Sequence, residues 1–278
     1  MSKPELFQAI NNVFSLGMFA ACIIVYTRVG VRLFREGGRV RVADFQVPEL
    51  FVAVVLGSYF IFTIWMNARQ GGDAAATINI DLLILSAGMF VVYTAGLSFF
   101  LAFGRKISYN QAFGLSRVPP LKIAAWALGL LACALPLIRI ASYATQITLT
   151  KDQMAQQAVV ELFRELSKKG NYSAIGEFCI ATVIVAPVCE EFLFRGFFYG
   201  VGKRFLGAIP AGILGAFFFA AFHSNLSSLA PLFVLALCFT LAYERTGSLL
   251  VPIGMHALFN SLNLLFLFGQ VQGWFPEL

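Results

Sequence analysis

Two adjacent glutamates, Glu190 and Glu191, lie inside a strongly apolar stretch in the second half of the chain. The apolar run 178–187 precedes them, and the aromatic run 197–199 follows them. A charged side chain at the centre of a membrane helix costs about 2.5–3.5 kcal/mol on insertion scales, so such residues usually act on something or pair with something. Arg195 lies four residues after Glu191, so on a helix it can neutralise one of the two carboxylates.

The chain contains only two histidines, His223 and His256, and both lie in its apolar C-terminal half. His223 closes an apolar run that begins at Phe219. His256 and Asn260 are four residues apart, so a helix presents their imidazole and amide groups on one face. A lone intramembrane histidine is often a hydrogen-bond partner between helices, and this interpretation stays open for each histidine alone. Together with the glutamate pair, these residues indicate one polar site.

These residue types suit the hydrolysis of an amide bond by an activated water. A carboxylate and an imidazole can together take a proton from water, and a second imidazole with a carboxamide can donate hydrogen bonds to a developing oxyanion. The sequence has no GxSxG elbow and no HExxH motif, so neither a serine hydrolase nor a zincin is supported. An alternative is zinc held by Glu190, His223 and His256, but we expect no metal.

Three short motifs, in this order, resemble those of the CAAX protease and bacteriocin-processing family, which includes the Ras-converting CAAX endopeptidases. The resemblance covers about residues 173–265. The motifs are Glu190-Glu191-x-x-x-Arg195, Phe219-x-x-x-His223 and His256-x-x-x-Asn260. The resemblance implies an eight-helix, glutamate-dependent intramembrane endopeptidase, and it implies no cofactor.

The resemblance also implies a role for each motif residue. Glu190 matches the general base that acts on water, and His223 matches the histidine that helps to activate that water. His256 and Asn260 match the pair that forms the oxyanion hole. Two further residues are expected to orient the others or to balance charge, namely Glu191 and Arg195.

The resemblance implies a peptide or protein substrate in the lipid bilayer, and no nucleic acid. CAAX endopeptidases remove a C-terminal tripeptide from prenylated proteins, whereas bacterial members have other roles, including peptide processing and bacteriocin self-immunity. We therefore expect a prenylated or another membrane-associated peptide. Two rival functions are a non-enzymatic immunity or partner-binding protein on the same scaffold and a proton-coupled transporter. The complete set of four candidate catalytic residues argues against the first rival, and the lack of an inverted repeat argues against the second.

The composition is that of an integral, multi-pass membrane protein. Hydrophobic residues make up 59% of the 278 residues and charged residues 12%, against about 25% charged in soluble domains. The net charge of +6 comes from short basic clusters between apolar segments, which resemble topology signals and not a nucleic-acid surface. We predict an all-α polytopic transmembrane helical bundle of about eight spans with one amphipathic interfacial helix.

Eight apolar segments must position the site. They are 10–34, 49–66, 80–103, 123–140, 175–204, 209–222, 229–243 and 249–268. We divide the chain into spans one to four (1–141), an amphipathic connection (142–172) and CAAX-protease-like spans five to eight (173–278). The distribution of basic residues favours both termini outside the cytoplasm. Residues 150–169 alternate apolar and charged side chains, which predicts a helix lying flat on the bilayer or a lid over the site.

The fifth segment raises a geometric problem. In a straight helix Glu190 would lie roughly 21 Å from the end near Arg204, whereas His256 would lie only about 10 Å from the same membrane face. We therefore predict a break near Pro187 or Gly196, or a tilted, partly submerged helix. The five cysteines are an odd number without a CxxC motif, which predicts free thiols. Cys189, beside the glutamates, is either a small apolar filler or a nucleophile.

Overall fold

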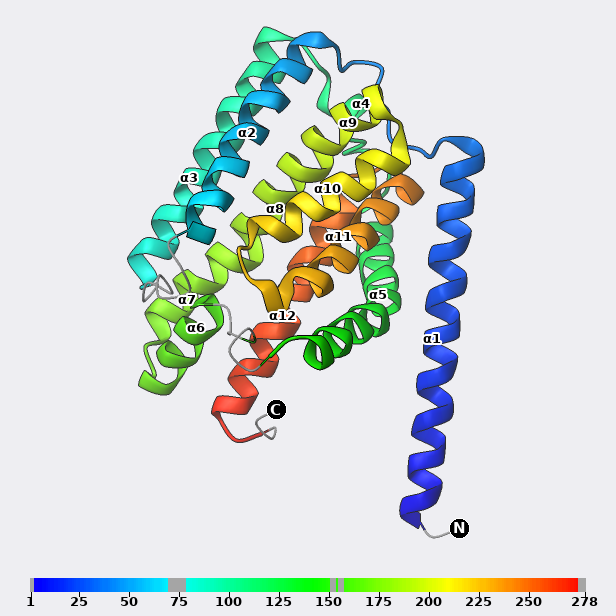
Figure 1. The fold of residues 1–278 in the computed structure, drawn as a ribbon, viewed down its shortest axis with the longest axis vertical. Helices are drawn as coiled ribbons and strands as arrows, with labels where there is room; N and C mark the ends of the chain where they lie inside the picture. Colours follow the sequence, from blue (N-terminus) through cyan, green and yellow to red (C-terminus); the bar gives the residue numbers. More distant parts are fainter. Residues whose placement is uncertain (1–2, 70–78, 151–153, 155–157, 275–278) are drawn as a thin grey trace.

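The computed structural model describes residues 3–69, 79–150, 154 and 158–274, and all regular secondary structure in these residues is helical (Figure 1). The α-helices are α1 (Lys3–Glu36), α2 (Val47–Arg69), α3 (Ile80–Phe99), α4 (Tyr109–Ala112), α5 (Pro120–Thr148), α6 (Ala158–Lys169), α7 (Tyr172–Cys179), α8 (Ala186–Glu191), α9 (Tyr199–Leu206), α10 (Ala208–Phe222), α11 (Leu226–Thr246) and α12 (Leu250–Val271). Three π-helical segments complete the set: η2 (Phe100–Gly104), η4 (Ile180–Val185) and η5 (Phe192–Phe198).

Within the described residues, six helices are long and apolar enough to cross a membrane. They are Val47–Asn67, Ile80–Gly104, Pro120–Thr148, Tyr172–Leu206, Leu226–Thr246 and Leu250–Val271. These six coincide with the predicted segments two to five, seven and eight, so the chain is an all-α, multi-pass integral membrane protein. The predicted sixth span, α10, is an apolar helix of only 15 residues, or about 22 Å, which is shorter than the ~30 Å hydrocarbon core. The predicted first span, α1, is not among the six.

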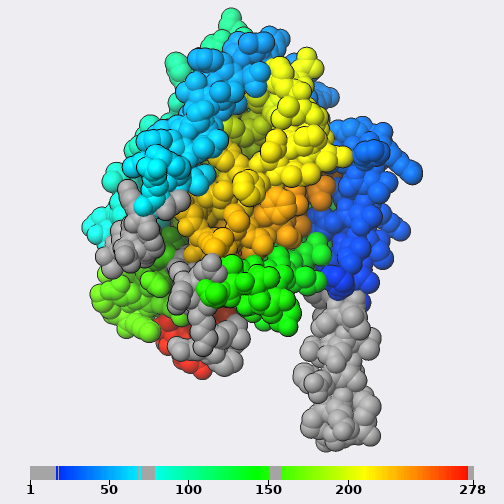
Figure 2. Space-filling model, viewed as in Figure 1, coloured from blue at the N-terminus to red at the C-terminus, as the bar shows by residue number. Residues whose placement is uncertain are grey.

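The helices form a layered bundle. α2 and α3 run side by side on one flank, α1 stands on the other, and α10 and α11 occupy the middle of the face shown (Figures 1 and 2). α1 is tied to α5 by a 2.8 Å hydrogen bond from the Tyr26 hydroxyl to the Leu130 carbonyl. Buried aromatic rings fill the centre, where Phe194 packs against Phe218, Phe219 and Phe222 of α10. The wide apolar surfaces that remain exposed are those expected of helices that face lipid.

The helix that carries the glutamates is continuous for 35 residues, Tyr172–Leu206. Of the two predicted alternatives, the break near Pro187 or Gly196 is therefore wrong, whereas the tilted, partly submerged helix stays a prediction. The helix instead widens into two π-helical segments, η4 and η5, on either side of α8. The site residues still meet because α12 packs against η4 and α8, in the middle of the long helix, and not against its end. Glu190 and His256 therefore lie at one level, although they differ in distance from the ends of their helices. π-Helical turns often occur at functional sites.

The amphipathic helix α6 is shorter than predicted and packs on protein. Leu162, Phe163 and Leu166 are buried against α7 and α12, and the Phe163 and Phe178 ring centroids are 5.1 Å apart. The apolar face of the predicted amphipathic helix is thus covered by side chains of α7 and α12, and its place at the membrane interface stays a prediction. The helix ends as predicted, at Gly170 with a φ of 64°. Of its predicted first residues, 151–153 and 155–157 lie outside the described part of the chain.

Candidate active site

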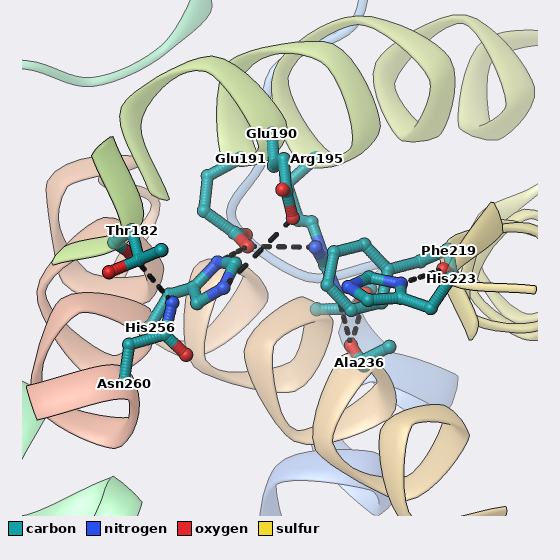
Figure 3. A network of polar contacts seen from close by, with 10 residues as sticks. Thr182, Glu190, Glu191, Arg195, Phe219, His223, Ala236, His256 and Asn260 are labelled. Atoms are coloured by element: carbon teal, nitrogen blue, oxygen red, sulfur yellow. Dashed lines mark hydrogen bonds and ion pairs between the residues drawn. The ribbon is translucent and has the colours of Figure 1, made fainter. Parts of the chain in front are cut away.

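Glu191 is the centre of a buried polar network. Its side chain is fully buried, and its Oε1 atom accepts from Nη1 of Arg195 at 2.8 Å and contacts Nδ1 of His256 at 2.9 Å (Figure 3). An ionised carboxylate can only accept hydrogen bonds, so the Nδ1 atom must carry a proton in this contact. Glu191 therefore keeps a proton on Nδ1 and fixes the orientation of the His256 ring, as carboxylates do for histidines in many enzymes.

Arg195 is buried as deeply as its partner. Its guanidinium lies 4.3 Å from the ring centroid of Phe219 and 5.2 Å from that of Phe239, and Nη2 donates to the Ala236 carbonyl at 3.4 Å. Two aromatic faces and a carboxylate thus surround the cation. This environment matters because a buried arginine without an ionic partner carries an uncompensated charge. The contact supports the charge-balancing role expected for Glu191 and Arg195.

Of the two carboxylates in the cluster, that of Glu190 has fewer hydrogen-bond partners. Its Oε2 atom is buried without a hydrogen-bond partner and lies 4.0 Å from Nε2 of His256. The side chain is 14% exposed, whereas that of Glu191 is 0% exposed. A distance of 4.0 Å is too long for a direct hydrogen bond, but one water can contact both atoms. Glu190 and His256 therefore flank a position suited to a reacting water.

His223 lies at the C-terminal end of α10, and the ring of Phe219 packs near both His223 and His256. Its Nδ1 atom is 2.9 Å from the Phe219 carbonyl, which can only accept, so Nδ1 donates and Nε2 of the neutral ring is left as an acceptor. The Phe219 ring centroid lies 4.9 Å from that of His223 and 5.9 Å from that of His256. Among the described residues no hydrogen bond or ion pair joins His223 to Glu190.

Asn260 is held by a carbonyl that the π-helical turn leaves free. In η4 the Ala186 N–H bonds to the Ala181 carbonyl, five residues earlier. The next residue, Pro187, has no N–H to offer the Thr182 carbonyl. Asn260 supplies the missing donor, with Nδ2 at 2.8 Å from that carbonyl. The amide has two N–H groups, so one remains available on the site-facing side chain.

The structure thus joins Glu191, Arg195 and His256 directly, places Oε2 of Glu190 4.0 Å from Nε2 of His256, and brings His223 close through the ring of Phe219 (Figure 3). Sequence reasoning gave no role to Phe219 or to Thr182. The only signal for the Thr182 contact was Pro187 in an apolar helix. The five cysteines are free, as predicted, and Cys189 is buried, which suits a filler. Among the described residues no group of three potential metal ligands has suitable geometry.

Comparison with known proteins shows what this region of the chain is similar to. Residues 175–262 match the family model described as Type II CAAX prenyl endopeptidase Rce1-like. This region is therefore similar to the Rce1-like family. It contains every residue of the three motifs, from Glu190 to Asn260, so the resemblance recognised in the sequence is confirmed.

Three curated relatives match part of the chain. An "Uncharacterized 24.3 kDa protein" of Escherichia coli is 39% identical over 92 residues, which are 30% of this chain and 41% of the relative. The "Putative membrane peptidase YdiL" of Bacillus subtilis is 26% identical over 98 residues, 35% of this chain and 40% of the relative. The "Membrane-embedded CAAX protease MroQ" of Staphylococcus aureus is 32% identical over 89 residues, 30% of this chain and 36% of the relative. The chain therefore matches less than half of each relative. No solved structure matches it significantly.

Proposed function

We propose that this protein is an intramembrane endopeptidase that hydrolyses a peptide bond with a water activated at the Rce1-like region. The observation that carries the proposal is the buried, unpaired Oε2 atom of Glu190, 4.0 Å from Nε2 of His256. A free carboxylate oxygen beside an oriented imidazole is suited to general-base catalysis. Two relatives whose names include peptidase or protease match about a third of the chain, which supports the same reaction class.

Charge balance defines the resting state that we propose. Ionised Glu190 and Glu191 with cationic Arg195 leave one negative charge in the cluster, and a protonated His256 cancels it. Both ring nitrogens then donate, Nδ1 to Glu191 and Nε2 toward the water position. Glu190 is left as the acceptor for the water proton, and the Nε2 atom of His223 is a second acceptor on the side of Phe219.

The reaction then follows from these positions. Water attacks the scissile carbonyl carbon while Glu190 takes its proton, and the carbonyl oxygen becomes an oxyanion. The Nε2–H of His256 and the second N–H of Asn260 donate to this oxyanion, which is a form of stabilisation worth about 10²–10³ in rate per donor. Collapse of the intermediate breaks the C–N bond, and Glu190 returns the proton to the leaving amine. The products are a new carboxylate and a free amine.

The substrate that we propose is a prenylated or another membrane-associated peptide, because the site lies on membrane-spanning helices. The test uses the purified full chain in liposomes with a quenched farnesylated CAAX peptide and its non-prenylated twin. Glu190→Gln removes the base, and Glu177→Gln is the matched control, an exposed glutamate on the same long helix. We expect cleavage by the wild type and the control but not by Glu190→Gln, both with and without a chelator.

Three results would contradict the proposal. Equal cleavage by Glu190→Gln would remove the glutamate mechanism. Loss of cleavage with a chelator, restored by zinc, would replace it with metal catalysis. If neither peptide is cleaved, we would compare the C-termini of membrane proteins in cells that carry wild type or Glu190→Gln, and identical C-termini would favour the non-enzymatic binder.

A further inference from the structure

A second polar site lies away from the glutamate cluster, where α1, the connection to α2 and the end of α11 meet. It is a pocket of about 80 Å³. Its lining residues are Val29, Arg32, Leu33, Glu36, Gly38, Arg39, Glu244 and Arg245. The volume is several times the roughly 10–15 Å³ that one water needs, so the pocket has room for a small polyatomic group.

The buried carboxylate of this pocket, that of Glu244, accepts hydrogen bonds from protein donors at both oxygens. Oε1 of Glu244 accepts from the Tyr199 hydroxyl and from Nζ of Lys203 at 2.6 Å. Oε2 accepts from the backbone N–H groups of Arg39 and Val40 at 2.8 and 3.1 Å. Four donors therefore satisfy Glu244, and its charge is matched by that of Lys203.

The other carboxylate of the pocket is also paired. Glu36 forms an ion pair with Arg32 at 2.6 Å. The side chains of Arg39 and Arg245 form no ion pair with any carboxylate of the described residues. Arg245 instead lies over the Trp126 ring, 5.1 Å from its centroid. The pocket is thus lined by three guanidinium groups and two carboxylates, and two of the arginines, Arg39 and Arg245, have no carboxylate partner, which favours the binding of an anion.

The pocket lies where the membrane-spanning part of the chain ends. Arg245 belongs to the last turn of α11, whose apolar span ends at Thr246. On α1, the apolar side chains of Val29 and Leu33 line the pocket itself. An anion that binds here therefore lies beside an apolar surface, which is the combination offered to a lipid with a charged headgroup.

We propose that this pocket binds the phosphate group of an anionic membrane phospholipid. Arg39 and Arg245 are the phosphate ligands. Gly38 has a φ of 72° and lies close to the Glu244 carboxylate. That carboxylate accepts a hydrogen bond from the Arg39 N–H and so holds the backbone of Arg39 in place. Arg117 adds a 2.8 Å hydrogen bond to the Arg39 carbonyl. The site is independent of the proposed peptidase activity.

The test is a lipid titration of the full chain in detergent, followed by native mass spectrometry. The ligands are phosphatidylglycerol, phosphatidylcholine with the same acyl chains, and inorganic phosphate. Arg39→Gln/Arg245→Gln removes the proposed ligands. Arg41→Gln/Arg204→Gln removes the same number of charges from exposed arginines outside the pocket. Arg39→Gln alone keeps the test valid if the loss of the Arg245–Trp126 contact unfolds the double variant.

We expect wild type to bind phosphatidylglycerol more tightly than phosphatidylcholine. Each pocket arginine removed should weaken phosphatidylglycerol binding about fivefold, the factor for roughly 1 kcal/mol per basic residue at an anionic surface. The control variant should stay within about twofold of wild type, because its arginines lie outside the pocket. Equal losses in both double variants, or none in either, would overturn the proposal. Displacement of phosphatidylglycerol by inorganic phosphate would assign the pocket to the free ion and overturn the lipid assignment.

Discussion

Glu191 and His256, 65 residues apart in the chain, contact each other through Oε1 and Nδ1 at 2.9 Å. The same carboxylate oxygen also accepts from Arg195, so a single buried atom joins a cation and an imidazole. This arrangement separates the two glutamates by role. Both glutamates keep a buried Oε2 atom without a hydrogen-bond partner, but Oε1 of Glu191 is committed to Arg195 and His256, whereas Glu190 lies 4.0 Å from Nε2 of His256.

Glu191→Ala should destabilise the protein by about 3–5 kcal/mol, because it leaves the buried Arg195 guanidinium without its ionic partner. The double variant Glu191→Ala/Arg195→Met should recover part of this loss, since it removes the orphaned charge as well. Thermal unfolding in detergent measures both. A double variant less stable than Glu191→Ala would show that Arg195 has another main partner. Peptide cleavage should stay low in both variants, because His256 loses its orienting contact.

Asn260→Ala should lower kcat by about 10²–10³ with little change in KM, because it removes one proposed oxyanion donor. The matched control is Ser261→Ala, the next residue on α12, whose hydroxyl only donates to the Ala257 carbonyl at 2.7 Å. Steady-state cleavage in liposomes gives kcat and KM for each variant. A rise in KM at unchanged kcat would instead place Asn260 in substrate binding.

Pro187→Ala should lower kcat about tenfold or less while KM and stability stay close to wild type. The substitution restores an N–H that competes with Asn260 for the Thr182 carbonyl. This competition weakens the hydrogen bond that positions the Asn260 side-chain amide. Pro136→Ala is the control, since Pro136 also lies inside a helix, α5. Full kcat for Pro187→Ala, or an equal loss for Pro136→Ala, would disprove the positioning role of the proline.

Gly38→Ala should cost more stability than Gly37→Ala, although both residues have positive φ values, 72° and 74°. A Cβ atom at Gly38 would overlap Oε2 of Glu244, whereas nothing lies near a Cβ atom at Gly37. We expect about 1–2 kcal/mol for the backbone strain at each site and a further 1–3 kcal/mol for the overlap at Gly38. Paired thermal unfolding curves in detergent test this difference, and equal costs would show that Glu244 can move aside.

The sequence determined the residues of the candidate site and much of the helix pattern. Glu191 with Arg195, and His256 with Asn260, are four residues apart, and helical periodicity alone places each pair on one face. The long apolar runs likewise determined the spanning helices, because the bilayer requires a minimum apolar length. These are local properties, so they can be read from spacing and composition.

The tertiary structure decided which groups pair across helices. The sequence could not tell which glutamate would take Arg195 and His256, because that depends on the rotation and axial offset of α8 and α12. The contact of Asn260 with Thr182 depends on a π-helical turn, and the burial of the apolar face of α6 depends on its docking onto α7 and α12. Helix formation follows from short-range hydrogen bonds along the chain. The offset between packed helices follows from side-chain packing over their whole length, which no local pattern encodes.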